Sequence, residues 1–92
     1  MTTQSVTVVN ALGLHARAAA RFVHVAARFH SQVRVARDAK VMDGKSIMGI
    51  LLLAASRGTT ITISADGDDE RAAVDALVQL VSGGFGEPTW NA

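Results

Sequence analysis

The chain has 92 residues, of which 49% are hydrophobic and 18% are charged, and this balance is typical of a folded globular domain rather than a disordered segment. This length allows one domain, which we expect to span residues 1–92, and leaves no room for a second. The net charge of +1 gives no general attraction to nucleic acid, and the absence of cysteine excludes disulfides and thiolate metal sites.

The first half of the chain carries the patterns of three strands and one helix. Apolar and polar residues alternate over 5–9 and again over 32–37, which predicts a strand in each range. Between them Gly13 marks a turn, and apolar residues at steps of three and four predict a helix from His15 or Ala16 to about Phe29. Asp38 and Ala39 then turn the second strand into a short partner over 40–42.

The second half begins with a short apolar helix and ends with a longer one. Ser46 stands at the N-cap position of a helix predicted over 47–56, with Gly58 as its C-cap glycine. The alternation over 60–64 predicts the last strand. The final helix stops at Gly83-Gly84, and its apolar face is formed by Ala73, Val74, Leu77, Leu80 and Val81. We expect residues 85–92 to form a loosely ordered tail, with Phe85 against the core and Trp90 mobile.

The predicted element order is β-α-β-β-α-β-α, which belongs to the α/β (α+β) class. Four strands with their helices on one face form an open-faced sandwich, in which one face of the sheet is packed and the other faces water. The pattern alone does not give the order of the strands in the sheet.

The sequence carries no signal for export or for membrane insertion. Residues 1–4 lack the basic region of a signal peptide. The longest apolar run, 47–55, is far shorter than the roughly 20 residues that span a bilayer. We therefore expect a cytoplasmic protein that does not enter the membrane.

One histidine stands where the first strand gives way to the first helix. His15 lies at or just before the first helical turn, where unpaired backbone N–H groups and the helix dipole favour an anion such as phosphate. An imidazole with an ordinary pKa of about 6.5 is mostly neutral, and therefore nucleophilic, at cytoplasmic pH. The guanidinium of Arg17 is permanently charged and can bind two phosphoryl oxygens. The pattern predicts a phosphoryl-accepting site and leaves open which ring nitrogen is used.

Three segments resemble signatures of one family. Gly13-Leu14-His15-Ala16-Arg17 resembles the phosphorylation site of HPr, the histidine-containing phosphocarrier of the bacterial sugar phosphotransferase system. The segments 43–49 and 54–58 resemble its second signature, around a regulatory serine. The resemblance implies a sheet order of 1-4-2-3 with three helices on one side, phosphorylation of His15 through Nδ1, and Arg17 beside the phosphate. Ala18 departs from the family, which usually has proline there.

The resemblance also implies partners. An HPr-like carrier accepts a phosphoryl group from an enzyme I-like protein and gives it to an enzyme IIA-like protein. It is a substrate of phosphotransferases rather than an enzyme, because one nucleophile without a bound acid, base or metal does not make a turnover catalyst. We expect a monomer without a cofactor. We also expect no metal, since His24 and His30 do not share a helix face.

Ser46 is the second candidate site. As an N-cap it has a structural role, and a phosphate there would place negative charge on a docking surface. The resemblance implies modification by an HPr kinase/phosphorylase where the organism has one. The basic stripe of Arg17, Arg21, His24 and Arg28 fits a solvated helix face or a docking face equally well. The residues that we predict for docking are Arg21, His24, Lys45, Ile47, Met48 and Leu51.

Several alternatives remain. The nitrogen-regulatory branch of the same system shares the His15 motif. A regulatory interaction module would act through Ser46 and would not need the histidine. A small phosphate-handling hydrolase would need a residue that positions water, and no Asn, Asp or Glu follows His15 in the first helical turn. A nucleic-acid role is the weakest, because the strands carry no aromatic platform.

Overall fold

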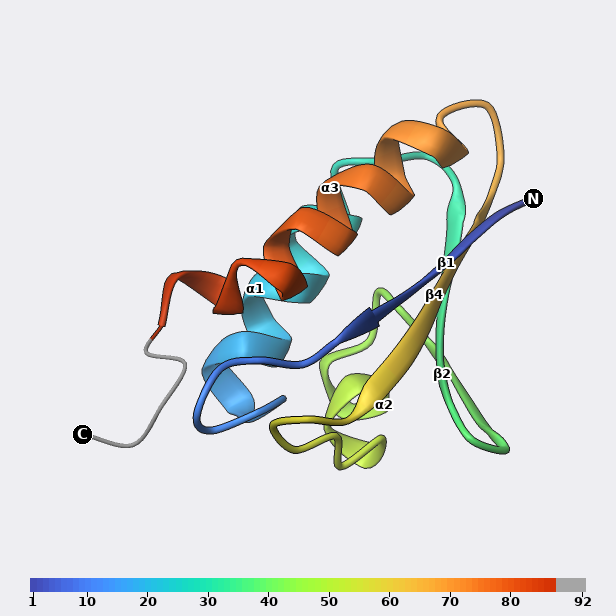
Figure 1. Ribbon diagram of the computed structural model, residues 1–92. Coiled ribbons are helices and arrows are strands. Elements are labelled where there is room, and N and C mark those ends of the chain that lie inside the picture. Colours follow the sequence, from blue (N-terminus) through green and yellow to red (C-terminus); the bar gives the residue numbers. More distant parts are fainter. Residues whose placement is uncertain (88–92) are drawn as a thin grey trace.

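The computed structural model describes residues 1–87 and contains a four-stranded sheet with three helices (Figure 1). The strands are β1 (Thr2–Thr7), β2 (Gln32–Arg37), β3 (Lys40–Asp43) and β4 (Thr60–Asp66). The helices are α1 (Ala16–Ala26), α2 (Ile47–Leu52) and α3 (Glu70–Ser82), followed by the 3₁₀ turn η1 (Gly84–Gly86). The sheet order is β1-β4-β2-β3 with every neighbouring pair antiparallel, which confirms the predicted fold class and order.

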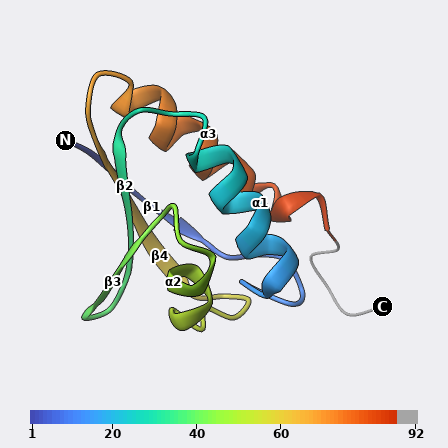
Figure 2. The ribbon, with the colours of Figure 1, turned by 180° about the vertical axis from the view of Figure 1, so that it is seen from behind.

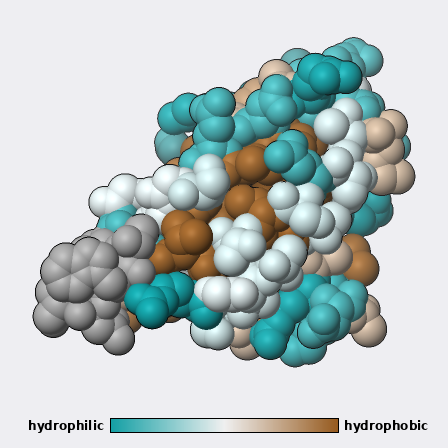
Figure 3. All heavy atoms as spheres, viewed as in Figure 1, coloured by the Kyte–Doolittle hydropathy of each residue, from teal (hydrophilic) through white to brown (hydrophobic). Residues whose placement is uncertain are grey.

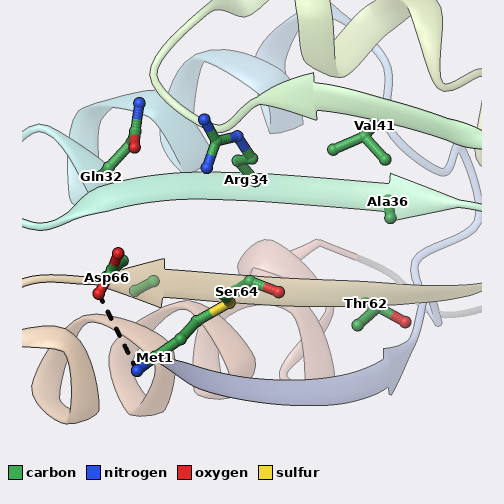
Figure 4. Close-up of a pocket in the computed structure, with 9 residues that line it drawn as sticks. Met1, Gln32, Arg34, Ala36, Val41, Thr62, Ser64 and Asp66 are labelled. Carbon is green, nitrogen blue, oxygen red and sulfur yellow. Dashed lines mark ion pairs between the residues drawn. The ribbon is translucent and has the colours of Figure 1, made fainter.

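The two faces of the sheet differ as the alternation predicts. On β2, Val33 and Val35 are buried while Gln32 and Arg34 are exposed. On the open face, β1 and β4 are joined by cross-strand hydroxyl pairs, such as Ser5 with Thr62 at 3.1 Å. This face has a shallow hollow of about 190 Å³ beneath Met1, Arg34 and Val41 (Figure 4).

The three helices lie on the other face of the sheet (Figures 1 and 2). Between them and the sheet is the core, whose largest fully buried side chain is Phe22 of α1. Viewed as in Figure 1, apolar residues gather between α3 and β1 and polar residues surround them (Figure 3). Among residues 1–87 no helix has the length and apolar character needed to cross a bilayer.

Two predicted helix ends were wrong. α1 ends at Ala26 rather than Phe29, because Arg28 N and Phe29 N donate to carbonyls only three residues back, which closes the last turn tightly. α2 ends at Leu52 rather than Ser56, and Ala54 has a left-handed φ of 52°.

The predicted C-cap of α2 was also wrong. The guanidinium of Arg37 donates to the carbonyls of Leu53 and Ala54, both at 2.9 Å, and so holds the two residues that follow the helix. Gly58 belongs instead to the turn before β4, where its N–H donates to Val8 O at 2.7 Å.

The first and last strands of the chain, β1 and β4, also differ from their predicted bounds. β1 begins at Thr2 and ends at Thr7 instead of spanning 5–9, and β4 continues past Ser64 to Asp66. These extra residues pair with each other, Thr2 lying opposite Ala65. The open face tolerates the polar residues of β1, so their sequence gives no apolar alternation to detect.

Candidate functional site

The loop before α1 is fixed against the segment that follows α2. Gly13 has a φ of +66°, and a Cβ placed there would lie 2.6 Å from Ala55 O. The next residue, Leu14, is buried and donates its N–H to Ala55 O at 2.9 Å. Only glycine suits this approach and this backbone conformation, so the loop delivers His15 to one fixed place.

His15 is the N-cap of α1, but its side chain does not cap the helix. The backbone is extended, with φ −86° and ψ −178°, and the carbonyl accepts the N–H of Ala19 at 2.8 Å. The side chain is 26% exposed. The helix therefore begins at His15 without using the imidazole, which leaves the ring available for other contacts.

A carboxylate from the other end of the chain lies against this ring. Nε2 of His15 is 2.9 Å from Oε1 and 3.1 Å from Oε2 of Glu87, 72 residues away in sequence. The Glu87 side chain is only 8% exposed. Sequence analysis looked for an acid only in the first helical turn after His15, where there is none, and so did not find Glu87.

Asn10 contacts the Glu87 carboxylate from the buried side. Its fully buried amide donates to Gly13 O at 2.7 Å and to Glu87 Oε1 at 3.2 Å. Within residues 1–87 its Oδ1 has no hydrogen-bond partner, which costs about 1 to 3 kcal/mol for a buried acceptor. The amide is thus oriented toward the loop and the carboxylate at a cost to its own oxygen.

The environment keeps Glu87 ionised. Burial raises the pKa of its carboxyl, but hydrogen bonds from His15 and Asn10 and the charges of His15 and Arg17 together lower it below its usual value. A negative charge therefore stays beside the imidazole at neutral pH.

Glu87 reaches His15 on a turn with unusual backbone geometry, and we call residues 83–87 the C-terminal strap. Gly84, Phe85 and Gly86 have φ values of 68°, 57° and 72°. The left-handed conformation costs an aromatic residue about 1 to 2 kcal/mol. Burial of the Phe85 ring, which is 2% exposed, contributes about 1.5 to 3 kcal/mol and offsets this cost.

Further hydrogen bonds close the strap onto the start of α1 (Figures 1 and 2). Arg21 donates through Nη1 to the Phe85 carbonyl, and Glu87 N donates to Gly84 O at 2.9 Å. Phe85 contacts the core as expected, while Trp90 lies outside the described residues.

The other residues predicted for the site lie on two neighbouring helices. Arg17 is exposed in the first turn of α1, and its charge acts on Glu87. Arg21 and Lys45 each donate a hydrogen bond to a backbone carbonyl within the fold. Arg21 donates to Phe85 O, and Lys45 Nζ donates to Phe29 O at 2.8 Å. His24 is exposed beside a shallow groove between α1 and α3.

Ser46 caps α2 as predicted. Its hydroxyl accepts the N–H of Gly49 at 3.0 Å. Beside it Ile47 is 44% and Met48 64% exposed, whereas Leu51 is half-buried against the core. Lys45, Ile47 and Met48 thus form one surface with Ser46. Among residues 1–87, no group of three or more His, Asp or Glu side chains is arranged to hold a metal ion.

Sequence reasoning missed Asn10 and Glu87. Asn10 reads as an ordinary turn residue, and Glu87 as a lone acid in an aperiodic tail. The Gly-Phe-Gly that precedes Glu87 was the one available signal, because glycines on both sides of an apolar residue permit a tight left-handed turn.

An open-faced sandwich with a partly exposed histidine and an exposed arginine at the start of one helix is suited to carrying a phosphoryl group. A family model for the PTS HPr component phosphorylation site matches residues 2–83. The chain is 47% identical over 87 residues to the phosphocarrier protein HPr of Cupriavidus necator, covering 95% of this chain and 98% of that protein. The chain therefore belongs to the HPr family of phosphocarrier proteins of the phosphotransferase system.

Solved structures agree with this assignment. The chain is similar to HPr from Thermoanaerobacter tengcongensis with a TM-score of 0.91 and 47% identity, over 95% of this chain and 98% of that one. It is similar to HPr from Bacillus anthracis str. Ames with a TM-score of 0.84 and 42% identity, over 87% of this chain and 95% of that one. The phosphocarrier function follows from the family, and homologues that are carriers support a non-catalytic role.

Proposed function

We propose that His15 is the residue that accepts the phosphoryl group, and that it does so through Nδ1. The observation that carries this proposal is that the two ring nitrogens of His15 have different surroundings. Nε2 lies against Glu87, while Nδ1 makes no hydrogen bond to any residue from 1 to 87. The side chain is 26% exposed, and because Nε2 is held by Glu87, we assign Nδ1 as the nitrogen that a partner protein approaches.

The start of α1 supplies the charge that a phosphoryl group requires. The first N–H groups of a helix have no intrahelical acceptor, and together with the helix dipole they amount to about half a positive charge. Arg17 adds a full one from the first turn, on a side chain that is exposed and therefore free to reorient. A phosphoryl group on Nδ1 is stabilised by both, without a metal ion.

The partners of this site are an enzyme I-like donor and an enzyme IIA-like acceptor, and the proposed place of action is the cytoplasm. Arg17, Arg21 and His24 form an exposed basic stripe on α1, and Ile47 and Met48 form an exposed apolar surface on α2. Together they suit a partner with an apolar centre and an acidic rim. The residues that we propose for the site all belong to one chain, which supports a monomer as the working form.

The test begins with phosphoenolpyruvate and a general enzyme I. The protein is expected to gain one phosphoryl group that is lost in acid, and His15→Ala is expected to gain none. The phosphoprotein should remain intact until an enzyme IIA protein is added. Uptake by the His15→Ala variant would contradict the proposal, and prompt loss without an acceptor would favour a hydrolase.

Supplying sugar-specific and nitrogen-regulatory enzyme IIA proteins in separate reactions then distinguishes the two branches of the system. The branch whose acceptor discharges the phosphoprotein faster is the one that this chain serves.

Regulation through Ser46 is a second proposal, supported by the position of its hydroxyl. A phosphate on this N-cap would keep an acceptor oxygen for Gly49 N, so the fold would tolerate it. It would also place negative charge next to Ile47 and Met48. An HPr kinase/phosphorylase should label the protein but not Ser46→Ala, and Ser46→Asp should slow phosphoryl uptake from enzyme I. Uptake at the unmodified rate in Ser46→Asp would contradict this role.

A further inference from the structure

Residues 84–87 of the C-terminal strap lie outside the part of the chain that the family model matches. That match ends at residue 83, and the turn that carries Glu87 begins there. The contact between Glu87 and His15 is therefore not supplied by the phosphorylation-site motif itself. It depends on the buried Phe85, the left-handed turn, and the bonds from Arg21 and Asn10.

The position of this carboxylate determines where the imidazole keeps its proton. An ionised carboxylate can only accept hydrogen bonds, and its oxygen lies 2.9 Å from Nε2. At that distance the hydrogen must be on Nε2. In the neutral ring the other nitrogen, Nδ1, then carries the lone pair.

We infer that Glu87 is a positioning residue that keeps the proton on Nε2 of His15 both before and after phosphorylation, so that phosphoryl transfer at Nδ1 requires no proton transfer. This inference rests on the proposed function of His15. It assigns to the strap a role in the reaction in addition to packing.

Phosphorylation then balances without a general base. The lone pair of Nδ1 forms the new N–P bond while the bond from phosphorus to the donor protein's atom breaks, and that electron pair stays on the donor. The ring keeps its Nε2 proton and becomes a cation beside the Glu87 carboxylate. The charge that appears on the ring is thus matched by a charge that is already in place.

The second half of the reaction reverses these steps. A lone pair of the acceptor protein's nucleophile forms a bond to phosphorus, the bond to Nδ1 breaks, and its electron pair returns to Nδ1. The ring is again neutral with the same proton on Nε2. Because Nε2 keeps its proton, the imidazole leaves as a neutral ring, whereas a ring without that proton would have to leave as an imidazolate anion. By holding the proton on Nε2, Glu87 keeps the phosphorylated ring in the form that can deliver its phosphoryl group.

The geometry keeps the carboxylate from competing with the phosphoryl group. Glu87 faces Nε2, while Nδ1 is a different atom of the ring, so the two negative groups occupy different positions around the imidazole. The Asn10 amide donates to the carboxylate from the buried side. Glu87 can therefore stay in place while Nδ1 gains and loses its phosphoryl group.

Two variants separate the hydrogen bond from the charge. Glu87→Gln keeps an oxygen that can accept the Nε2 hydrogen but removes the charge, and Glu87→Ala removes both. Asp75→Asn is the matched control, because it removes one carboxylate from the exposed face of α3. The ring tautomer is read from the imidazole ¹⁵N shifts of the unphosphorylated proteins. Delivery is measured as the rate at which each phosphoprotein loses its phosphoryl group to an enzyme IIA protein.

The expected tautomer is Nε2–H in the wild type, in Glu87→Gln and in the control, with a mixture of both tautomers in Glu87→Ala. Delivery should fall about tenfold in Glu87→Gln and at least as far in Glu87→Ala. A tenfold fall corresponds to one pKa unit of lost stabilisation of the charged ring. Asp75→Asn should deliver at the wild-type rate. A role confined to packing would lower stability without changing the tautomer.

Two results would overturn the inference. One is a proton on Nδ1 in the wild type, and the other is wild-type delivery in both Glu87 variants. Failure of the proposed function is distinguishable, because the wild type would then take up no phosphoryl group at His15. The tautomer measurement does not need the phosphorylated protein, so it would still decide whether Glu87 holds the ring proton.

Discussion

The N-termini of α1 and α2 both have backbone N–H groups without an intrahelical acceptor, but the two N-cap residues differ in whether they bond to them. At α2 the N-cap Ser46 accepts the N–H of Gly49, so its side chain closes the helix. At α1 the N-cap His15 makes no such bond, and its ring contacts Glu87 instead. The difference shows that one side chain can close its own helix or remain available for chemistry, and that the available one needs support from elsewhere in the fold.

The start of α3 extends the comparison. Its N-cap, Asp69, does not cap the helix through its side chain either. The carboxylate accepts instead from His30 N at 2.8 Å and from Ser31 N at 2.9 Å, and so ties the loop after α1 to α3. Of the three helices in residues 1–87, only α2 is capped by the side chain of its own N-cap residue.

The largest effect is expected from a substitution that disrupts the contact between Glu87 and His15 and leaves the Ser46 cap intact. Phe85→Ala should lower the free energy of unfolding by about 3 kcal/mol, because it removes a buried aromatic ring. It should also loosen the strap, so that the His15 ring resonances change while the amide resonance of Gly49 does not. Chemical denaturation and NMR check both parts. Leu52→Ala, at a 53% exposed position, is the control and should stay within about 0.5 kcal/mol of wild type.

A second test supplies α1 with the cap that it lacks. His15→Ser and His15→Ala both lose the contact with Glu87, so the difference between them isolates the cap. The serine variant should be more stable by about 1 kcal/mol in urea unfolding. Equal stability would mean that the start of α1 gains nothing from a side-chain cap, and the comparison with α2 would fail.

The reverse change at α2 should affect stability alone. Ser46→Ala is expected to lose about 1 kcal/mol, at most, because Gly49 N loses its side-chain acceptor. Ser46→Asp should recover most of this loss, since aspartate is also a good N-cap. The same urea series measures both variants, and a stability loss that aspartate does not restore would show that the hydroxyl has another structural role.

The smallest expected effect is the pH dependence of stability that Asp69, at the start of α3, contributes. The Ser31 hydroxyl and the amides of His30 and Ser31 hydrogen-bond to Asp69 and lower its pKa from 3.8 to about 2, although desolvation opposes this. A carboxyl whose folded pKa is depressed stabilises the fold above its unfolded pKa and loses that contribution as pH falls through the folded value.

The stability advantage of wild type over Asp69→Asn should therefore be constant from neutral pH down to about pH 4 and shrink toward about pH 2. Urea midpoints at several pH values measure it. The pKa of Glu70 is also lowered to about 2, but this residue is present in both proteins and cancels in the difference. A gap between the two proteins that widened on acidification would contradict this prediction.

The sequence predicted most of the fold because most of the fold is periodic. Apolar residues recur at every second position in a strand, as Val33 and Val35 do on β2. In a helix they recur every three or four positions, and Phe22 belongs to such a series on α1. The end of α1 was missed because its last turn tightens into hydrogen bonds between residues three apart. The end of α2 was missed because the hydrogen bonds from Arg37 come from outside the local pattern.

The candidate site divides in the same way. His15 and Arg17 could be predicted, since their spacing at a helix start carries the chemistry. Glu87 and Asn10 could not, because their contact joins residues 77 positions apart and needs a left-handed turn around Phe85. Sequence reasoning located the nucleophile but missed the residues that hold its ring.

The most direct test of the account is phosphoryl uptake by His15→Ser and Ser46→Ala, measured side by side by intact mass with phosphoenolpyruvate and a general enzyme I. Both variants have a residue that differs from the native N-cap, so loss of a native cap residue alone cannot explain a difference. The account predicts one acid-labile phosphoryl group on Ser46→Ala and none on His15→Ser. An acid-labile phosphoryl group on His15→Ser would show that the acceptor lies elsewhere and would contradict the central claim.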